Sequence, residues 1–351
     1  MGHIVFNNEY YNSIMKEFGY SPLEFEPISF SLAVMTKEDL QRQWLCHTGG
    51  RSFAESLTNK RAVVTTGFGL SGVPHMGTLA QILKAIRLQQ AGLPVQIVLG
   101  DLDAYNGKNV RFERTRELAK FYRQFILDSG FSCEPPNSLR TQYESLTTLR
   151  LAYLIGHYME DEMFNCAEED LHQFYSQHGK VDSSMSYRRK LSLNLMIADF
   201  LELLEQNSFD AVMVILGIDE HRYVDFGRKV LEKMTEELPV FRGKSYSAMY
   251  SSIIRGFHGY PKMSKSFHGS GITVDMPDEQ IKCLIENGEE VTPFPETNVL
   301  YQLISSVSLY GNEQIKEAYE ECSKQSERWK LIKREYAQHL IALCRRWPNI
   351  S

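Results

Sequence analysis

The chain has 351 residues, of which 43 % are hydrophobic, and this is enough for one large core and a smaller second domain because single cores stop growing near ~250–300 residues. The formal net charge of −6 gives the chain no general attraction to nucleic acid, so any RNA site must be a local basic patch. The six cysteines form no C-x-x-C pair, so neither zinc-site spacing nor a disulfide framework is visible, which fits a reducing cytoplasm.

Residues 1–20 lack the basic flank and apolar run of a signal peptide. The longest apolar stretches, such as residues 211–218, are far shorter than the ~20 residues that span a bilayer, so we expect a non-membrane protein. Residues 1–60 are predicted to form an N-terminal extension around one helix, Lys37–Trp44, which Thr36 can cap.

A strand–helix–strand unit begins at Arg61. The β-branched run at residues 62–66 predicts a buried parallel strand, and apolar residues at helical spacing predict a helix over residues 77–90. Residues 95–99 read as a second strand. This βαβ unit predicts an α/β fold with a parallel sheet.

The remaining chain divides into three parts. Residues 106–190 are mostly helical in pattern, include an acidic cluster at 168–170, and resemble an insertion between two halves of the sheet. A helix over residues 191–204 and a strand over 211–216 begin the second half. We therefore predict a catalytic domain at 61–275 and a small α-helical C-terminal domain at 276–351.

A glycine-rich turn, residues 67–78, lies between the first strand and its helix. Backbone N–H groups and the helix dipole favour an anion at such a helix start, and glycines let phosphates approach the chain. Gly67, Gly69 and Gly72 also satisfy the glycine pattern of dinucleotide-binding proteins. The acidic residue that should follow ~20 residues later is absent, because the first candidate is Asp101. An NAD-dependent oxidoreductase is therefore disfavoured.

Two motifs flank the predicted phosphate site. Residues 75–78, His-Met-Gly-Thr, are similar to the HIGH motif, and residues 262–266 read KMSKS letter for letter. Glycines on both sides of the second motif predict a mobile loop. Its two lysines can close on the β- and γ-phosphates of ATP and stabilise the departing pyrophosphate.

With both motifs in place, residues 61–275 resemble the catalytic domain of class I aminoacyl-tRNA synthetases, which has a Rossmann-type fold. Three stretches narrow the resemblance to the subgroup of tryptophanyl- and tyrosyl-tRNA synthetases: residues 100–105 (GDLDAY), 196–201 (MIADFL) and 217–220 (GIDE). The resemblance covers more than half of the chain. It implies ATP-dependent activation of an amino acid to an aminoacyl adenylate and transfer to tRNA.

The resemblance also implies a nucleotide site. His75, Lys262 and Lys265 are the expected catalytic residues, with His75 stabilising the pentavalent transition state rather than acting as a base. The expected ATP-binding residues are Gly67, Gly69, Gly77, Thr78, Gly217, Asp219, Met263, Ser264 and Ser266. Asp219 follows a strand and can accept hydrogen bonds from the ribose; the alternative is that it only caps the next helix. Mg²⁺ is expected to enter with ATP, and no separate metal site is predicted.

The amino acid pocket departs most from the family pattern. Its expected residues are Thr66, Asp101, Asp103, Ser192, Met196, Asp199 and Glu220. In the related enzymes a Tyr, a Gln, an Asp and a second Gln bind the substrate, at positions that here hold Ser192, Met196, Asp199 and Glu220. Glu220 can pair with a substrate ammonium, whereas Met196 offers only apolar contact or is ordinary core. The loss of two amides and a phenol argues against tyrosine or tryptophan as the substrate.

The acceptor is the second open question. Basic and aromatic residues alternate over 324–347, which predicts either a phosphate-contacting helix or basic side chains at a helix C-terminus with aromatics in the core. Three functions stay open: a tryptophanyl-like aminoacyl-tRNA synthetase, an enzyme that activates an amino acid for a non-tRNA acceptor, and a catalytically silent nucleotide-binding relative. The related enzymes are homodimers, so we expect a homodimer.

Overall fold

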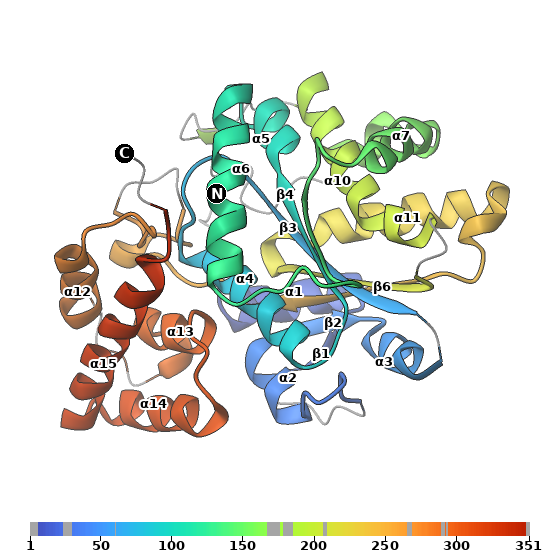
Figure 1. The fold of residues 1–351 in the computed structure, drawn as a ribbon. Coiled ribbons are helices and arrows are strands. Elements are labelled where there is room, and N and C mark those ends of the chain that lie inside the picture. Colours follow the sequence, from blue (N-terminus) through green and yellow to red (C-terminus); the bar gives the residue numbers. More distant parts are fainter. Residues whose placement is uncertain are drawn as a thin grey trace.

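The structure is a computed structural model, and it describes residues 6–23, 30–59, 61–166, 176–177, 185–205, 209–264, 269–288, 292 and 294–348. The described part is built on one seven-stranded sheet with helices on both faces (Figure 1). The strands are β1 (Ser21–Pro22), β2 (Cys46–Thr48), β3 (Ala62–Gly69), β4 (Val95–Gly100), β5 (Ser138–Thr141), β6 (Ala211–Gly217) and β7 (Ser245–Ser251).

The strand order is β1-β2-β7-β6-β3-β4-β5. Strands β7, β6, β3, β4 and β5 are parallel, and β1 and β2 extend the β7 edge in antiparallel register. Strand β3, the middle one of the five parallel strands, pairs with β4 on one side and with β6 on the other. The carboxyl ends of β3, β6 and β7 therefore meet at one edge of the sheet, where ligands bind in open α/β folds.

Helices cover both faces of this sheet. The described α-helices are α1 (Asn8–Phe18), α2 (Lys37–Gln43), α3 (Gly50–Asn59), α4 (Met76–Gln90), α5 (Asp101–Gly107), α6 (Phe112–Asp128), α7 (Leu146–Ile155), α8 (Asp161–Asn165), α10 (Tyr187–Glu205), α11 (His221–Glu237), α12 (Asp278–Asn287), α13 (Val299–Ser306), α14 (Asn312–Lys324) and α15 (Glu327–Cys344). The α/β fold class and the predicted elements at 37–44, 62–66, 77–90, 95–99, 191–204 and 211–216 are confirmed.

Two apolar clusters form the core, one on each face. Along β6, Met213 and Ile215 enter the cluster that holds α4, α6 and the C-terminal helices, whereas Val212 and Val214 enter the cluster that holds α1, α7, α10 and α11. Successive side chains of a strand point to opposite faces, so a strand covered on both sides is apolar throughout. This explains the continuous apolar run that predicted β6.

Two parts of the sheet differ from the sequence predictions. The region predicted as a helical insertion, 106–190, contributes the edge strand β5, which pairs in parallel with β4. Strand β5 is short and reads Ser-Leu-Arg-Thr, so it lacks the apolar run on which the other strand predictions rest. Residues of the predicted N-terminal extension form β1 and β2 and join the same sheet. The acidic cluster at 168–170 lies outside the described residues.

The C-terminal helices α12–α15 form a group beside the sheet (Figure 1, orange to red). Trp347, which is 5 % exposed, packs edge-on against Tyr122 and Phe125 of α6. Arg87 of α4 donates to the backbone carbonyls of Ser308 and Tyr310. These contacts hold the C-terminal helices against α4 and α6. In the described part of the chain, no helix is long and apolar enough to cross a membrane.

Candidate active site

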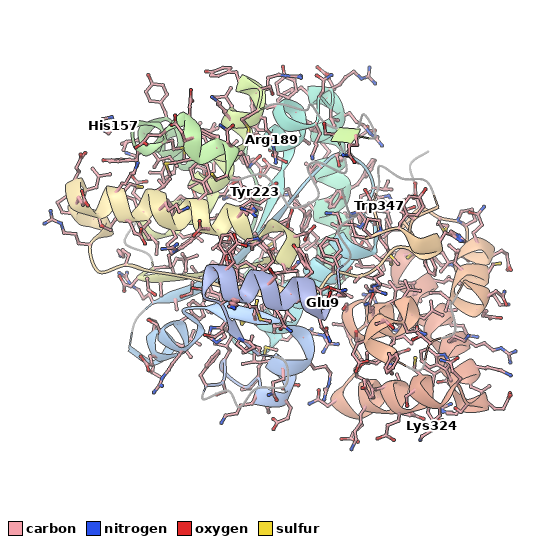
Figure 2. All side chains as sticks on the ribbon, turned by 180° about the vertical axis from the view of Figure 1, so that it is seen from behind. Glu9, His157, Arg189, Tyr223, Lys324 and Trp347 are labelled. Atoms are coloured by element: carbon pink, nitrogen blue, oxygen red, sulfur yellow. The ribbon has the colours of Figure 1, made fainter. Side chains whose placement is uncertain are left out.

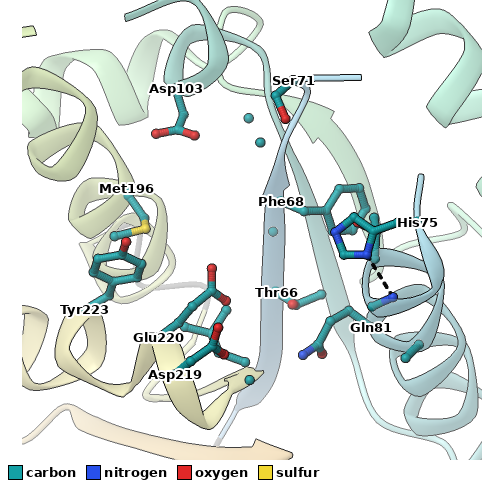
Figure 3. Close-up of a pocket in the computed structure, with 18 of the residues that line it drawn as sticks. Thr66, Phe68, Ser71, His75, Gln81, Asp103, Met196, Asp219, Glu220 and Tyr223 are labelled. Atoms are coloured by element: carbon teal, nitrogen blue, oxygen red, sulfur yellow. Dashed lines mark hydrogen bonds between the residues drawn. The ribbon is translucent and has the colours of Figure 1, made fainter. Parts of the chain in front are cut away.

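A cavity of about 480 Å³ opens at the carboxyl ends of β3, β6 and β7. Figure 3 shows its two walls: His75 and Gln81 come from the β3–α4 side, and Met196 of α10, Glu220 just before α11 and Tyr223 of α11 form the other. The predicted site residues that line it are Thr66, Gly67, Gly69, His75, Gly77, Thr78, Asp103, Met196, Asp199, Gly217, Asp219, Glu220, Lys262, Met263 and Ser264. The structure therefore brings the two motifs, 187 positions apart from His75 to Lys262, to one cavity.

His75 is the N-cap of α4. Its Nδ1 accepts a hydrogen bond from the backbone N–H of Gly77 at 3.0 Å. Because Nδ1 is the acceptor, the ring proton lies on Nε2, which can donate to an oxyanion. A Cβ at Gly77 would lie 2.7 Å from His75 Cε1, so only glycine leaves room for the ring. The helix dipole and the imidazole donor act at the same place.

The lysine-loop motif is tied to the start of α4 through its C-terminal flank. The backbone N–H of Met76 donates to the carbonyl of Ile272, and that of Val274 donates to the carbonyl of Pro74. Buried Ser270 closes the loop, because its hydroxyl accepts from the backbone N–H of Ser264 and donates to the carbonyl of the same residue, both at 3.0 Å. Lys265 and Ser266 lie outside the described residues.

Lys262, the first lysine of the motif, donates to Oδ2 of Asp219 at 2.5 Å. Both side chains are largely buried, with 19 % and 5 % of their surfaces exposed. A Cβ at Gly217 would lie 2.6 Å from Oδ1 of Asp219, so the glycine leaves room for this carboxylate. The predicted ribose acceptor and the predicted phosphate lysine are therefore in contact with each other in this structure.

One face of α10 points toward the cavity. Arg189, Ser192, Met196 and Asp199 follow one another at three- and four-residue intervals, which places them on the same side of a helix. Arg189 donates to the hydroxyl of Tyr223 at 2.8 Å and lies 3.8 Å from a carboxylate oxygen of Asp103 (Figure 2 labels Arg189 and Tyr223). This wall of the cavity is polar and carries both signs of charge.

Ser192 does not line the cavity. It is buried, and its hydroxyl donates to the carboxylate of Asp103. The sequence analysis expected Ser192 in the amino acid pocket because of its motif position. Ser192 instead orients Asp103, which itself lines the cavity.

Asp199 lies at the centre of a buried polar network. Its Oδ1 accepts from Arg140 at 2.9 Å and its Oδ2 accepts from the side-chain amide of Gln142 at 2.7 Å. Arg140 also donates to Glu202 at 2.5 Å. Burial raises the pKa of Asp199 from 3.8 to about 6, and the charge of Arg140 opposes this rise. The network fixes the carboxylate in one orientation at the edge of the cavity.

Asp101 also does not line the cavity. It is buried, and its Oδ1 accepts hydrogen bonds from the backbone N–H groups of Leu102, Gln142 and Tyr143 at 3.0–3.2 Å. Its other oxygen lies 3.5 Å from the guanidinium of Arg116. In this structure Asp101 therefore joins the end of β4 to the segment after β5. Its contact with the amino acid stays a prediction.

The cavity lining includes polar residues that the sequence analysis did not name, among them Gln81, Lys84, Gln142, Arg189 and Tyr223. Two of them carry a detectable signal. Arg189 precedes Ser192 by three residues on a helix face that the motif had already identified. Lys84 is a charged residue within the apolar run Leu79, Ile82, Leu83, Ile86, and such a position is seldom polar without a reason. Gln142 follows the strand that had no sequence signal.

The fold has solved counterparts. The tryptophanyl-tRNA synthetase of Aeropyrum pernix superposes with a TM-score of 0.75 at 18 % identity, covering 97 % of this chain and 94 % of that one. The tyrosyl-tRNA synthetase of Archaeoglobus fulgidus, solved with L-tyrosine, superposes with a TM-score of 0.65 at 19 % identity, covering 85 % of this chain and 93 % of that one. At these identities the likeness concerns the fold.

The sequence also has curated relatives. The tyrosine–tRNA ligase of Methanopyrus kandleri is 26 % identical over 220 residues, which are 63 % of this chain and 62 % of that protein. The tyrosine–tRNA ligase of Methanococcus maripaludis is 24 % identical over 285 residues, which are 76 % of this chain and 80 % of that protein.

A family model described as tRNA synthetases class I (W and Y) matches residues 57–345. That span contains the cavity, the histidine of the β3–α4 turn and the lysine-loop motif. The chain therefore belongs to the class I tRNA synthetases of the W and Y group, and its function class is that of an aminoacyl-tRNA synthetase, a ligase.

Proposed function

We propose that this chain activates one amino acid with ATP to an enzyme-bound aminoacyl adenylate and then transfers the aminoacyl group to tRNA. The single observation that carries the proposal is the convergence of His75, Asp219 and Lys262 on one cavity. A phosphate-binding helix start, a ribose acceptor and a loop lysine are the three parts that binding and cleavage of a nucleoside triphosphate require.

In this proposal the triphosphate lies at the start of α4. The backbone N–H of Thr78 and the Nε2–H of His75 donate to the α-phosphate. Gly67, Gly69 and Gly77 leave room for it. Asp219 accepts from the ribose hydroxyls, with Gly217 beside it. Lys262 and Lys265 act on the β- and γ-phosphates, with Met263, Ser264 and Ser266 carrying the loop backbone around them.

Mg²⁺ belongs to the proposal as a companion of ATP. Within the described residues, no group of three or more His, Cys, Asp or Glu side chains is placed to hold a metal ion. The ion would therefore be held mainly by the phosphate oxygens, as Mg²⁺ often is, and would neutralise part of their charge.

The chemical step needs alignment rather than proton removal. The amino acid carboxylate is already ionised at neutral pH, and one of its oxygens attacks the α-phosphorus. As that O–P bond forms, the bond from the α-phosphorus to the bridging oxygen breaks, and pyrophosphate leaves with the electron pair. His75, the α4 N-terminus and the loop lysines stabilise the negative charge that builds up on these oxygens.

The contact between Lys262 and Asp219 gives ATP binding a consequence for the loop. The ribose hydroxyls and Lys262 compete for the same carboxylate. Binding of ATP frees Lys262 from Asp219 and makes it available to the phosphates. The loop therefore takes its catalytic position only when the ribose site is filled, which is the behaviour expected of a closing loop.

The amino acid lies on the α10 side of the cavity. Glu220 faces the cavity and pairs with the substrate ammonium, while Thr66, Met196 and Asp199 line the place of its side chain. Asp103, held by Ser192 and Arg189, closes the opposite end. Tyrosine and tryptophan are the first substrates to test, because the relatives are named for them, but the polar wall formed by Arg189, Asp103 and Tyr223 extends the search to non-protein amino acids.

We place the catalytic domain at 61–275 and the helical domain at 276–351, and we expect a cytoplasmic homodimer. The aromatic residues Trp329, Tyr336 and Trp347 are buried, so they cannot stack on RNA bases. An RNA contact of the C-terminal helices would therefore use basic side chains, such as Lys282 and Arg334, which line a groove between α12 and α15.

The proposal is tested by ATP–pyrophosphate exchange, screened over protein and non-protein amino acids. We expect exchange that depends on one amino acid or a few close analogues. Lys262→Ala and Lys265→Ala should reduce it strongly, whereas Lys120→Ala, at an exposed position of α6, should not. Exchange unaffected by both loop variants would refute the loop assignment. Exchange without charging of total tRNA would refute tRNA as the acceptor.

A further inference from the structure

Lys84, in the third turn of α4, is a buried lysine with no polar partner among the residues that the structure describes. Only 5 % of its surface is exposed, and it lines the same cavity as His75 and Asp219. It makes no hydrogen bond or ion pair with any residue in the described ranges; its ammonium lies over the ring of Trp44, 5.2 Å from the ring centroid. Burial, assisted by the charge of Arg87, lowers its pKa from 10.5 to about 7.

An unpaired buried ammonium destabilises the folded chain, because the ring of Trp44 returns only part of the hydration that the charge loses. A methionine would fit an apolar helix face such as this one without that loss. The position therefore makes physical sense if a ligand in the cavity supplies a hydrogen-bond acceptor to Lys84.

The position of Lys84 along α4 separates it from the phosphates. Gly77, Gln81 and Lys84 lie on one face of the helix, and Lys84 is about 10 Å from Gly77 at a rise of ~1.5 Å per residue. The phosphates lie at the helix start by the proposed function. The acceptor that meets Lys84 is therefore at the other end of the nucleotide.

The order of the strands also indicates that the base of the nucleotide would lie beside Lys84. Asp219, the proposed ribose acceptor, follows β6, and the adjacent strand β7 ends at Ser251, which also lines the cavity. Trp44 lies next to that strand end, because the following residue, Leu45, donates its backbone N–H to the carbonyl of Tyr250 at 2.8 Å. Lys84 over Trp44 is therefore one strand beyond the ribose, where the base would lie.

Gln81, one turn before Lys84, completes a matched pair of polar groups. Its amide N–H donates to the hydroxyl of Ser251 at 3.5 Å, and its Oε1 is buried without a hydrogen-bond partner in the described residues. A donor and an acceptor that are both unpaired thus lie on the base side of the cavity. Adenine offers the complementary set, because its ring nitrogens accept and its 6-amino group donates.

We propose that Lys84 determines nucleotide specificity by donating a hydrogen bond to a ring nitrogen of adenine, while Gln81 Oε1 accepts from the 6-amino group. The inference rests on the proposed function, because it requires ATP in this cavity. A 6-oxo purine would present an oxygen acceptor to Gln81 Oε1, so GTP and ITP should bind less tightly than ATP.

The test is direct nucleotide binding, measured by calorimetry without amino acid, with ATP, 1-deaza-ATP, 7-deaza-ATP and ITP. For the unmodified protein we expect about tenfold weaker binding of one deaza analogue and of ITP, as for the loss of one hydrogen bond to a charged group. Lys84→Met should bind ATP about tenfold more weakly and lose its discrimination against that deaza analogue. Lys120→Met should keep both properties.

Three results would overturn the inference: equal binding of ATP and both deaza analogues by the unmodified protein, unchanged ATP affinity in Lys84→Met, or an unchanged analogue penalty in that variant. The first needs no variant, so a folding defect cannot hide the answer. Thermal unfolding of Lys84→Met should show equal or higher stability, because a buried unpaired charge is removed. If the unmodified protein binds no ATP at all, the proposed function fails instead.

Discussion

Gly77 shows how one residue controls the geometry of the proposed nucleotide site. Its backbone N–H fixes the tautomer of His75, and its missing side chain leaves the space that the imidazole ring fills, since a Cβ would lie 2.7 Å from Cε1. The motif spacing could be read from the sequence, but this reason for the glycine could not. It depends on the N-cap conformation of His75, which only the folded α4 defines.

Gly77→Ala should leave the fold intact and reduce amino-acid-dependent pyrophosphate exchange by roughly 10²-fold, because a displacement of about 1 Å at a reacting centre has effects of that size. Steady-state exchange kinetics measure it. Gly156→Ala is the matched control, because the added Cβ would meet only one atom, at 3.9 Å. Equal rates for the two variants would show that the position of His75 does not matter.

The raised pKa of Asp199 should make the free energy of unfolding depend on pH. Its pKa is about 6 in the folded protein and 3.8 in its ordinary state, because it is buried. Between pH ~4 and ~6 the folded state therefore holds more protons than the unfolded state, and stability falls as pH rises, by about 3 kcal/mol in total. Above pH ~6 this contribution is constant.

Urea unfolding at pH 4, 5, 6 and 7 tests this prediction when the unmodified protein is compared with Asp199→Asn. The unmodified protein should lose up to ~3 kcal/mol relative to the variant between pH 4 and 6, and nothing further up to pH 7. A difference that stays constant over the whole range would contradict a raised pKa for Asp199.

At the scale of elements, the lysine loop illustrates what a motif leaves open. The letters KMSKS predicted a loop near phosphates, but not that Ser270 closes it through both hydrogen bonds to Ser264, nor that Lys262 would contact Asp219. Both features depend on how the loop packs against the end of β6 and the start of α4. Neither is encoded within the five residues of the motif.

Ser270→Ala should reduce kcat for pyrophosphate exchange several-fold, because the loop base loses the hydroxyl that joins its two ends. The expected loss in stability is small, about 1 kcal/mol for the missing hydrogen bonds. Ser308→Ala, at an equally buried serine in the C-terminal region, is the control and should leave kcat unchanged. A kcat for Ser270→Ala equal to that of the control would mean that the loop needs no such closure.

Strands with a continuous apolar run and helices with apolar residues at helical spacing were predicted well. Elements without such a pattern were missed, for a physical reason. The apolar runs of β3, β4 and β6 report burial on both faces. Strand β5 lies at the sheet edge and alternates between buried and partly exposed residues. Only one of its four side chains, that of Leu139, is apolar, so the strand gave no sequence signal. Gln142, which follows β5 and anchors Asp199, was missed together with it.

At the scale of the whole molecule, the C-terminal helices share one apolar cluster with α4 and α6. Trp347 inserts among Phe121, Tyr122 and Phe125 of α6. The sequence left open whether its aromatic and basic residues bind RNA or form a core. The aromatics are core, and the basic residue Arg328 pairs with Glu317 and Glu335 at the surface. The sequence alone could not show which of these side chains are buried, because the packing of the helices determines which face of each helix is covered.

Trp347→Ala should lower the free energy of unfolding by ~3–5 kcal/mol, as for other large-to-small changes of buried aromatics. Chemical denaturation measures it. Tyr153→Ala, at a residue that is 92 % exposed, should change stability by less than ~0.5 kcal/mol. Similar small effects of both variants would indicate that Trp347 does not hold the C-terminal helices in place.

We infer that one cavity holds ATP between the His75 turn, Asp219 and the lysine loop. A crystal structure with a non-hydrolysable ATP analogue tests it most directly. We predict the α-phosphate beside Nε2 of His75, ribose hydroxyls donating to Asp219, and Lys262 released from Asp219 toward the phosphates. A nucleotide bound elsewhere, or one bound in the cavity while Lys262 and Asp219 remain paired, would contradict the account.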